Sequence, residues 1–187
     1  MFKSFLFVIV LSTTLMASIQ AQNTIGDRKG YTPQMGNLVD MLEDLKNRVT
    51  SQVESLDQAG TDFLLDEDAN RIGAMIYHLA ATEKYYQLYT FEGRSFTKEE
   101  EAQWMPPLQL GEPARNEFQG RPISFYLDIW EQVRTETLEY LSQQEDEWLD
   151  KRPKNARMNN HWAWFHVMEH QANHMGQIAL VKKRIPH

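Results

Sequence analysis

The sequence predicts an all-α fold, a four-helix bundle with one long crossover loop. Four segments carry apolar residues at the three- and four-residue spacing of amphipathic helices, and none shows the sustained alternation of a half-buried strand. A stretch rich in proline and glycine separates the second helical segment from the third, where the chain would cross over. The 187 residues are 42% hydrophobic and 24% charged, an ordinary composition for one globular domain.

The N-terminal residues 1–21 are predicted to be a cleaved signal peptide. Lys3 precedes an apolar run, and Ala21 offers a small residue for cleavage. The run is shorter than the roughly 20 residues needed to span a bilayer, and no later segment reaches that length. We therefore expect an exported protein, periplasmic or extracellular, without a stable membrane anchor, whose bundle domain occupies residues 22–187.

The first two helices follow from apolar stripes and their end signals. The first begins after Thr32-Pro33 and ends near Gly60, and its stripe consists of Met35, Leu38, Met41, Leu42, Leu45, Val49 and Val53. The second opens with the acidic residues 66–68, which suit the positive end of the helix dipole, and stops at Gly93.

The second half of the chain is predicted to contain a short helical turn, the crossover loop and two long helices. The turn covers residues 97–104, and the irregular loop covers residues 105–120, a length that is uncommon in compact bundles and often covers a site. The third helix starts at Pro122 and continues to the break at Pro153. The fourth covers residues 159–184, and we assign three aromatic residues at its start to the core: Trp162, Trp164 and Phe165.

Charge and cysteine content exclude several classes of function. The formal net charge is -7, which argues against a broad basic surface for nucleic acid. The sequence contains no cysteine, so disulfides, thiolate nucleophiles and zinc ribbons are excluded. Any metal must be held by nitrogen and oxygen donors.

Three histidines on the fourth helix make it the candidate site. His166, His170 and His174 recur every four residues, so each lies about 40° from the one before and all three share one face. Histidines on adjacent turns of a helix can bind one divalent ion. His78, midway along the second helix, is a natural further ligand. The alternative is that these side chains are core histidines satisfied by hydrogen bonds.

Two stretches resemble the DinB-like (YfiT-like) superfamily of four-helix metalloproteins. One is HVMEHQANHMGQ, from His166 to Gln177, and the other is IYHLAATEKYY, residues 76–86. The resemblance implies an up-down-down-up bundle whose metal is bound by His78, His170 and His174. His166 and Gln177 would then lie beside the ligands without binding the ion. Many relatives carry a basic residue where this chain has Met175, so any anion contact made there is not expected here.

The implied site has the donor set of a catalytic centre. Three neutral imidazoles leave at least one coordination position open. Zinc and nickel suit imidazole donors best, and manganese and iron are compatible with them. Tyr85 lies about 20° from the face of His78 and is a candidate polar neighbour of the ion, with the role of a core tyrosine as the favoured alternative. No catalytic acid or base is identified from the sequence.

The resemblance narrows the function to a few classes. Characterised relatives include S-transferases that use low-molecular-weight thiols, a thiol-dependent isomerase and proteins described as metal-dependent hydrolases. We predict an exported metal-dependent enzyme of the thiol S-transferase or hydrolase type that acts on a small molecule. Two alternatives stay open: a non-catalytic metal-containing bundle with a stress or binding role, and a dimeric interaction module without metal. A homodimer is also compatible with the enzyme and with the non-catalytic metal-containing bundle.

Overall fold

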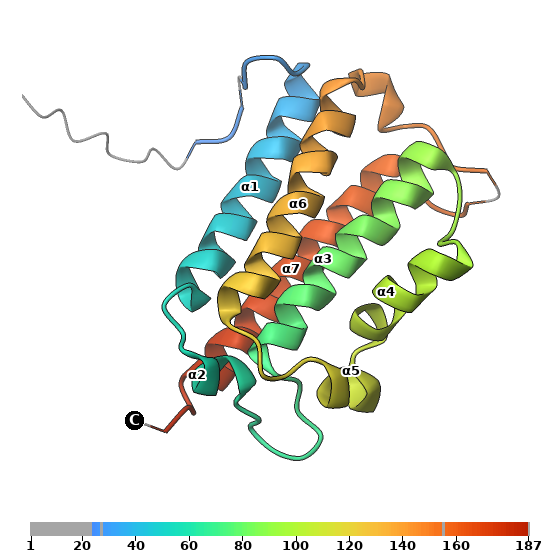
Figure 1. Ribbon diagram of the computed structural model, residues 1–187. Coiled ribbons are helices and arrows are strands. Elements are labelled where there is room, and N and C mark those ends of the chain that lie inside the picture. The colour runs from blue at the N-terminus through green and yellow to red at the C-terminus, as the bar shows by residue number, and fades with distance from the viewer. Residues whose placement is uncertain (1–23, 27, 155, 187) are drawn as a thin grey trace, which may run out of the picture.

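Four long helices form the body of the protein in the computed structural model, which describes residues 24–26, 28–154 and 156–186. They are α1 (Pro33–Val53), α3 (Ile72–Gln87), α6 (Ile123–Ser142) and α7 (Asn160–Lys182) (Figure 1). No strand occurs in these ranges, which confirms the predicted all-α class. The predicted signal peptide lies outside the described residues. Within them, no helix combines the length and the apolar character needed to cross a membrane.

The helices run in the order that the family resemblance implies. Lys182 donates to the carbonyl of Gln52, so α1 and α7 end together and are parallel. The beginnings of α3 and α6 meet where a Cβ on Gly73 would come within 2.5 Å of the Tyr126 ring, so glycine permits this close packing. Trp164, near the start of α7, donates to Thr90 just beyond the end of α3. The bundle is therefore up-down-down-up (Figure 1).

The first predicted helix is two helices. α1 ends at Val53, and the short α2 (Gln58–Asp62) follows, with the Asp57 carboxylate accepting a hydrogen bond from the Gly60 N–H at 2.8 Å. The prediction of one helix ending near Gly60 is therefore wrong, because Asp57 offers an N-cap that starts a new helix.

The second predicted helix begins later than expected and ends where expected. α3 starts at Ile72, so the acidic residues 66–68 lie in the preceding turn. The helix continues into a π-helical turn, η1 (Leu88–Glu92), and Gly93 ends it with a φ of 66°. That left-handed conformation is one that glycine adopts without steric cost, which explains the stop.

The crossover is helical, which corrects the predicted irregular loop over residues 105–120. α4 (Lys98–Gln109) begins at a capping box made by Thr97 and Glu100, and α5 (Gly111–Glu117) follows directly. Two prolines lie in the last turns of α4. Pro107 has no N–H for the carbonyl of Gln103, and the Tyr77 hydroxyl donates to that carbonyl at 3.4 Å instead. The prolines therefore remove hydrogen bonds within α4 without ending the helix.

The third predicted helix is shorter than expected. α6 ends at Ser142, and the polar residues beyond it turn away through a 3-10 turn, η2 (Asp146–Trp148). There the Asp146 carboxylate accepts hydrogen bonds from the N–H groups of Gln34 and Met35, at 3.0 and 3.2 Å. The segment leaves α6 because it supplies the N-terminal cap of α1.

The last helix matches its prediction except in its aromatic residues. The Asn159 side chain caps α7 by accepting from the N–H of Trp162 at 2.9 Å. Trp164 is fully buried, whereas Trp162 and Phe165 are 46% and 50% exposed. The expectation that all three belong to the core is therefore wrong for two of them. Residues 162 and 165 lie on the outer face of α7, on which an apolar residue also occurs at position 180.

Candidate metal centre

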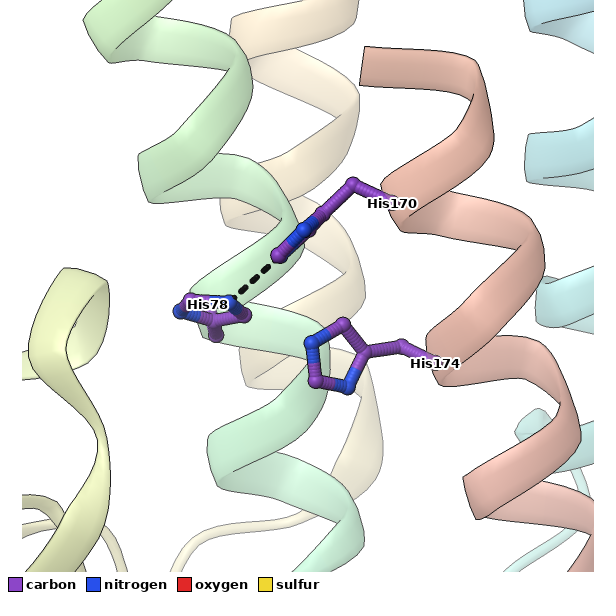
Figure 2. A group of neighbouring side chains, drawn as sticks. All are labelled: His78, His170 and His174. Atoms are coloured by element: carbon purple, nitrogen blue, oxygen red, sulfur yellow. Dashed lines mark hydrogen bonds between the residues drawn. The ribbon is translucent and has the colours of Figure 1, made fainter. Parts of the chain in front are cut away.

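The structure brings together the three histidines that the family resemblance implies. His78 comes from α3, and His170 and His174 come from adjacent turns of α7 (Figure 2). One ring nitrogen from each lies within 4.8 Å of the others, and the Nε2 atoms of His78 and His170 are 2.6 Å apart. His78 and His174 are buried, and His170 is partly exposed.

The antiparallel contact of α3 with α7 creates this arrangement. The centroid of the His78 ring is 4.8 Å from those of both His170 and His174, so it lies level with the middle of the pair. Residues four apart on a helix lie above one another, which places the two imidazoles of α7 4.7 Å apart. Both rings point toward α3 (Figure 2).

The crossover fixes the orientation of the His78 ring. Nδ1 of His78 donates to the carbonyl oxygen of Pro107 at 2.9 Å. This carbonyl belongs to the last turn of α4, where carbonyl groups have no N–H partner within the helix. With the proton on Nδ1, the lone pair of His78 is on Nε2 and faces α7, the tautomer that a metal ligand requires.

The electrostatics keep all three imidazoles neutral. Burial lowers the pKa of His78. Burial and, second, the neighbouring His78 lower the pKa of His170 to about 3 and that of His174 to about 4. Neutral imidazole is the form that binds metals, so the residues are in the ligating state at pH 7.

The donor set fits a divalent cation. A hydrogen bond can pair His78 with His170, but the buried Nδ1 of His174 makes no hydrogen bond of normal geometry among the described residues, although Gln177 is close enough to His174 to raise its pKa. Buried polar atoms are normally hydrogen-bonded, so this orphan atom requires an explanation. An ion between α3 and α7 would be held by His78, His170 and His174 and would remove the need for protons between them. The three-histidine cluster therefore indicates a divalent metal site.

The remaining sequence candidates lie around the cluster and not in it. His166 is one turn before His170, with Nδ1 3.1 Å from the Glu169 carboxylate and its ring stacked on Trp162. Gln177 is exposed in the turn after His174. Tyr85 stacks on Tyr89, with ring centroids 5.9 Å apart.

A buried polar network beside the histidines escaped the sequence analysis. Glu83 of α3 is fully buried, and Arg134 of α6 donates to its two oxygens at 2.7 and 2.9 Å. Trp130 and Gln171 donate to the same carboxylate at 3.0 and 3.2 Å. Because Gln171 directly follows His170, the network fixes α7 against α3 and α6 at the height of the site. Its sequence signal was a glutamate in a helix that is otherwise apolar around its circumference.

The charge of Glu83 is matched by its surroundings. Burial alone would raise the pKa of Glu83, but Arg134 and the hydrogen bonds of Thr137 and Trp130 bring that pKa below its usual value. Arg134 also contacts Glu43 of α1 at 2.9 Å and the Leu42 carbonyl at 2.7 Å. The ion pair thus links three helices of the bundle.

Surface hollows do not mark the histidine cluster. One hollow of about 710 Å³ lies along α1 between residues such as Thr24, Asp40 and Arg48, and no histidine lines it. A hollow of about 400 Å³ is nearer, at the start of α7, between Arg152, Arg157 and the Trp162 that stacks on His166. The histidine cluster is therefore marked by its three facing donor atoms.

The fold and the cluster define a helical bundle with a three-histidine metal site between facing helices. The chain also matches the family model described as mycothiol-S-transferase over residues 37–186, which includes all three histidines. The protein therefore belongs to the mycothiol S-transferase family, within the DinB/YfiT-like superfamily, and the resemblance seen in the sequence is confirmed. No curated protein matches the chain.

Proposed function

We propose that this protein is a metal-dependent thiol S-transferase that joins a low-molecular-weight thiol to an electrophilic small molecule. The observation that carries the proposal is the cluster of His78, His170 and His174 in a chain of this family. The cluster offers three nitrogen ligands, and no carboxylate or further histidine joins it among the described residues. Three protein ligands leave room for a substrate at the ion, as in catalytic sites.

The reaction requires a thiol to become a better nucleophile. His78, His170 and His174 would hold the divalent ion, and the ion would supply Lewis acidity that lowers the pKa of a thiol beside it. The sulfur then forms a bond to an electrophilic carbon of the second substrate. The leaving group departs with the electron pair of the broken bond, and the proton of the thiol passes to water.

The residues of this chain supply position and charge. Pro107 holds the His78 ring, and Glu83 and Gln171 hold the segment of α7 that carries His170. Neutral imidazoles leave the positive charge of the ion uncompensated, which favours a negatively charged sulfur beside it. Imidazole donors suit zinc and nickel, and we propose one of these two as the resident ion, with manganese and iron as the next candidates.

The identity of the thiol depends on where the protein acts. The name of the family supports mycothiol. The predicted signal peptide would place the site outside the cytoplasm, where cytosolic thiols are scarce, and would favour another thiol or water as the co-substrate. Water in place of the thiol would make the enzyme a hydrolase, the second type predicted from the sequence.

The test is metal content followed by an activity screen. The mature protein, purified without a histidine tag or added metal, is analysed by mass spectrometry beside His170→Ala and His174→Ala. We expect about one equivalent of metal in the wild type and none in the variants, with equal helicity. The loaded enzyme is then screened with mycothiol, other small thiols and ester or amide substrates. Absence of metal after reconstitution with zinc, nickel or manganese would refute the proposal, and hydrolysis without thiol transfer would replace it.

A further inference from the structure

A buried hydroxyl group lies beside the histidine cluster. Thr82 is one turn after His78 on α3 and is 6% exposed. By helical geometry it lies about 40° from His78 and about 40° from Tyr86, midway between them. His78 contacts His170 of α7, and Tyr86 contacts His166 of the same helix. Thr82 therefore faces α7 at the level between His166 and His170, one helical turn along α3 from the level of the histidine cluster.

The hydroxyl of Thr82 has no hydrogen-bond partner among the described residues. Threonines in helices usually donate to the carbonyl four residues earlier, which leaves no donor free. The structure contains four such bonds, at 2.6 to 3.2 Å, made by Thr61, Thr90, Thr135 and Thr137. Thr82 does not make this bond, so its donor remains available inside the bundle.

We infer that the Thr82 hydroxyl donates a hydrogen bond to the sulfur of the thiol substrate bound at the three histidines. The inference rests on the proposed function and assigns to it a residue that contacts the substrate. Three observations carry it: the position of Thr82 on the α3 face between His78 and Tyr86, its burial, and its unused donor. An unpaired buried hydroxyl is unfavourable, and a ligand that accepts its proton removes that cost.

The chemistry of the partner follows from what surrounds the hydroxyl. Among the described residues no carboxylate joins the three histidines, so an ion held there would favour an acceptor with negative charge as its further ligand. A hydrogen bond to a charged acceptor is stronger than one between neutral groups, so Thr82 would favour thiolate over thiol. It would also fix the direction of the sulfur lone pair that attacks the second substrate.

The test compares thiol binding in cobalt-substituted protein, which needs no turnover. The variants are Thr82→Val, which keeps the shape and removes the hydroxyl, and Thr82→Ser, which keeps the hydroxyl. Thr50→Val is the matched control, because Thr50 of α1 is the other helical threonine whose hydroxyl is buried without a partner in the described ranges. Mercaptoethanol and mycothiol are titrated separately, and the sulfur-to-cobalt charge-transfer absorption is recorded.

We expect every variant to bind cobalt with the stoichiometry of the wild type. Thr82→Val should bind both thiols about tenfold more weakly or worse, whereas Thr82→Ser and Thr50→Val should bind them as the wild type does. In metal-free protein, Thr82→Val should have an equal or higher Tm, because the wild-type hydroxyl is buried without a partner. If Thr82→Val does not fold, Thr82→Ala removes the same hydroxyl and replaces it in the comparison.

The outcomes separate this inference from the proposed function. Wild-type affinity for both thiols in Thr82→Val would overturn the inference and leave the S-transferase proposal intact. Loss of cobalt in that variant would show that Thr82 supports the ligands, which also overturns the inference. A wild-type cobalt protein that binds neither thiol would refute the proposed function itself.

Discussion

Two sets of buried polar groups lie side by side where α3 packs on α7, and they differ in what completes them. Around Glu83, both carboxylate oxygens receive hydrogen bonds, and the positive charge of Arg134 balances the negative one. Around His78, one turn earlier, ring nitrogens face one another, and the Nδ1 of His174 has no hydrogen-bond partner in the described part of the chain. The first set is completed by the chain itself. The second has the donor atoms that could hold a metal ion, which is the difference between a candidate ligand site and a structural network.

The largest change in the free energy of unfolding is expected from breaking the network around Glu83. Arg134→Met leaves the Glu83 carboxylate buried without its counter-charge, so the free energy of unfolding should fall by about 3 to 5 kcal/mol. Urea denaturation followed by circular dichroism measures this change. Arg48→Met is the control, because Arg48 makes an exposed pair with Asp44 and its loss should cost about 0.5 kcal/mol or less. Equal effects of the two substitutions would show that the network is not a structural anchor.

Removal of a histidine from the cluster should weaken metal binding and leave the fold intact. His78→Ala, His170→Ala and His174→Ala should each weaken metal binding by about a hundredfold or more, since even an outer partner of a ligand contributes roughly 10- to 100-fold. The unfolding free energy of the metal-free protein should change far less than in Arg134→Met. Competition titration against a chelator measures the affinity. A variant that retains wild-type affinity would remove that histidine from the site.

The pH dependence of metal-free protein should report the same histidines. The pKa values of about 3 for His170 and about 4 for His174 in the folded protein lie below the ordinary 6.5. The unfolded chain therefore binds protons first as the pH falls, and stability should decrease between about pH 6.5 and pH 4. Urea unfolding with a chelator present, at several pH values, measures this slope. The His170→Ala/His174→Ala double variant should show a smaller slope, and an unchanged slope would contradict the assignment.

The smallest effect should come from the histidine outside the cluster. His166 shares the face of the ligands, but its Nδ1 is engaged by Glu169 and its ring stacks on Trp162. His166→Ala should therefore leave metal stoichiometry and affinity at wild-type values, because the three donors remain in place. Mass spectrometry and chelator competition test this. Loss of the ion in His166→Ala would show that the metal site also includes His166.

The three histidines of the cluster could be predicted from the sequence, because they follow from the spacing within one helix or from the family resemblance. His170 and His174 share a helix face by their spacing alone, and the family pattern adds His78. The pairing of Glu83 with Arg134 was not accessible in this way. These residues lie on different helices, and their meeting depends on the register of α3 against α6, which no local pattern specifies.

The boundaries of the helices were harder to predict than the helices themselves. Pro106 and Pro107 lie in the stretch predicted to be an irregular loop, yet α4 continues through them. The Gln103 carbonyl, which has no N–H partner at Pro107, accepts a hydrogen bond from the Tyr77 hydroxyl instead. The end of α6 was placed too late because its polar continuation carries no stop signal of its own. Its path is set by Asp146, which caps a helix more than a hundred residues earlier.

The contact of His78 with the carbonyl of Pro107 has a consequence for anyone who engineers this protein. The acceptor is a main-chain atom, so a point substitution at position 107 does not delete it from the chain. Insertion or deletion within α4 would shift the carbonyl instead. A designer who builds the three histidines into another helical bundle would accordingly also need a main-chain carbonyl that accepts from the Nδ1 of the His78 equivalent. Without it, that imidazole could rotate or adopt the other tautomer.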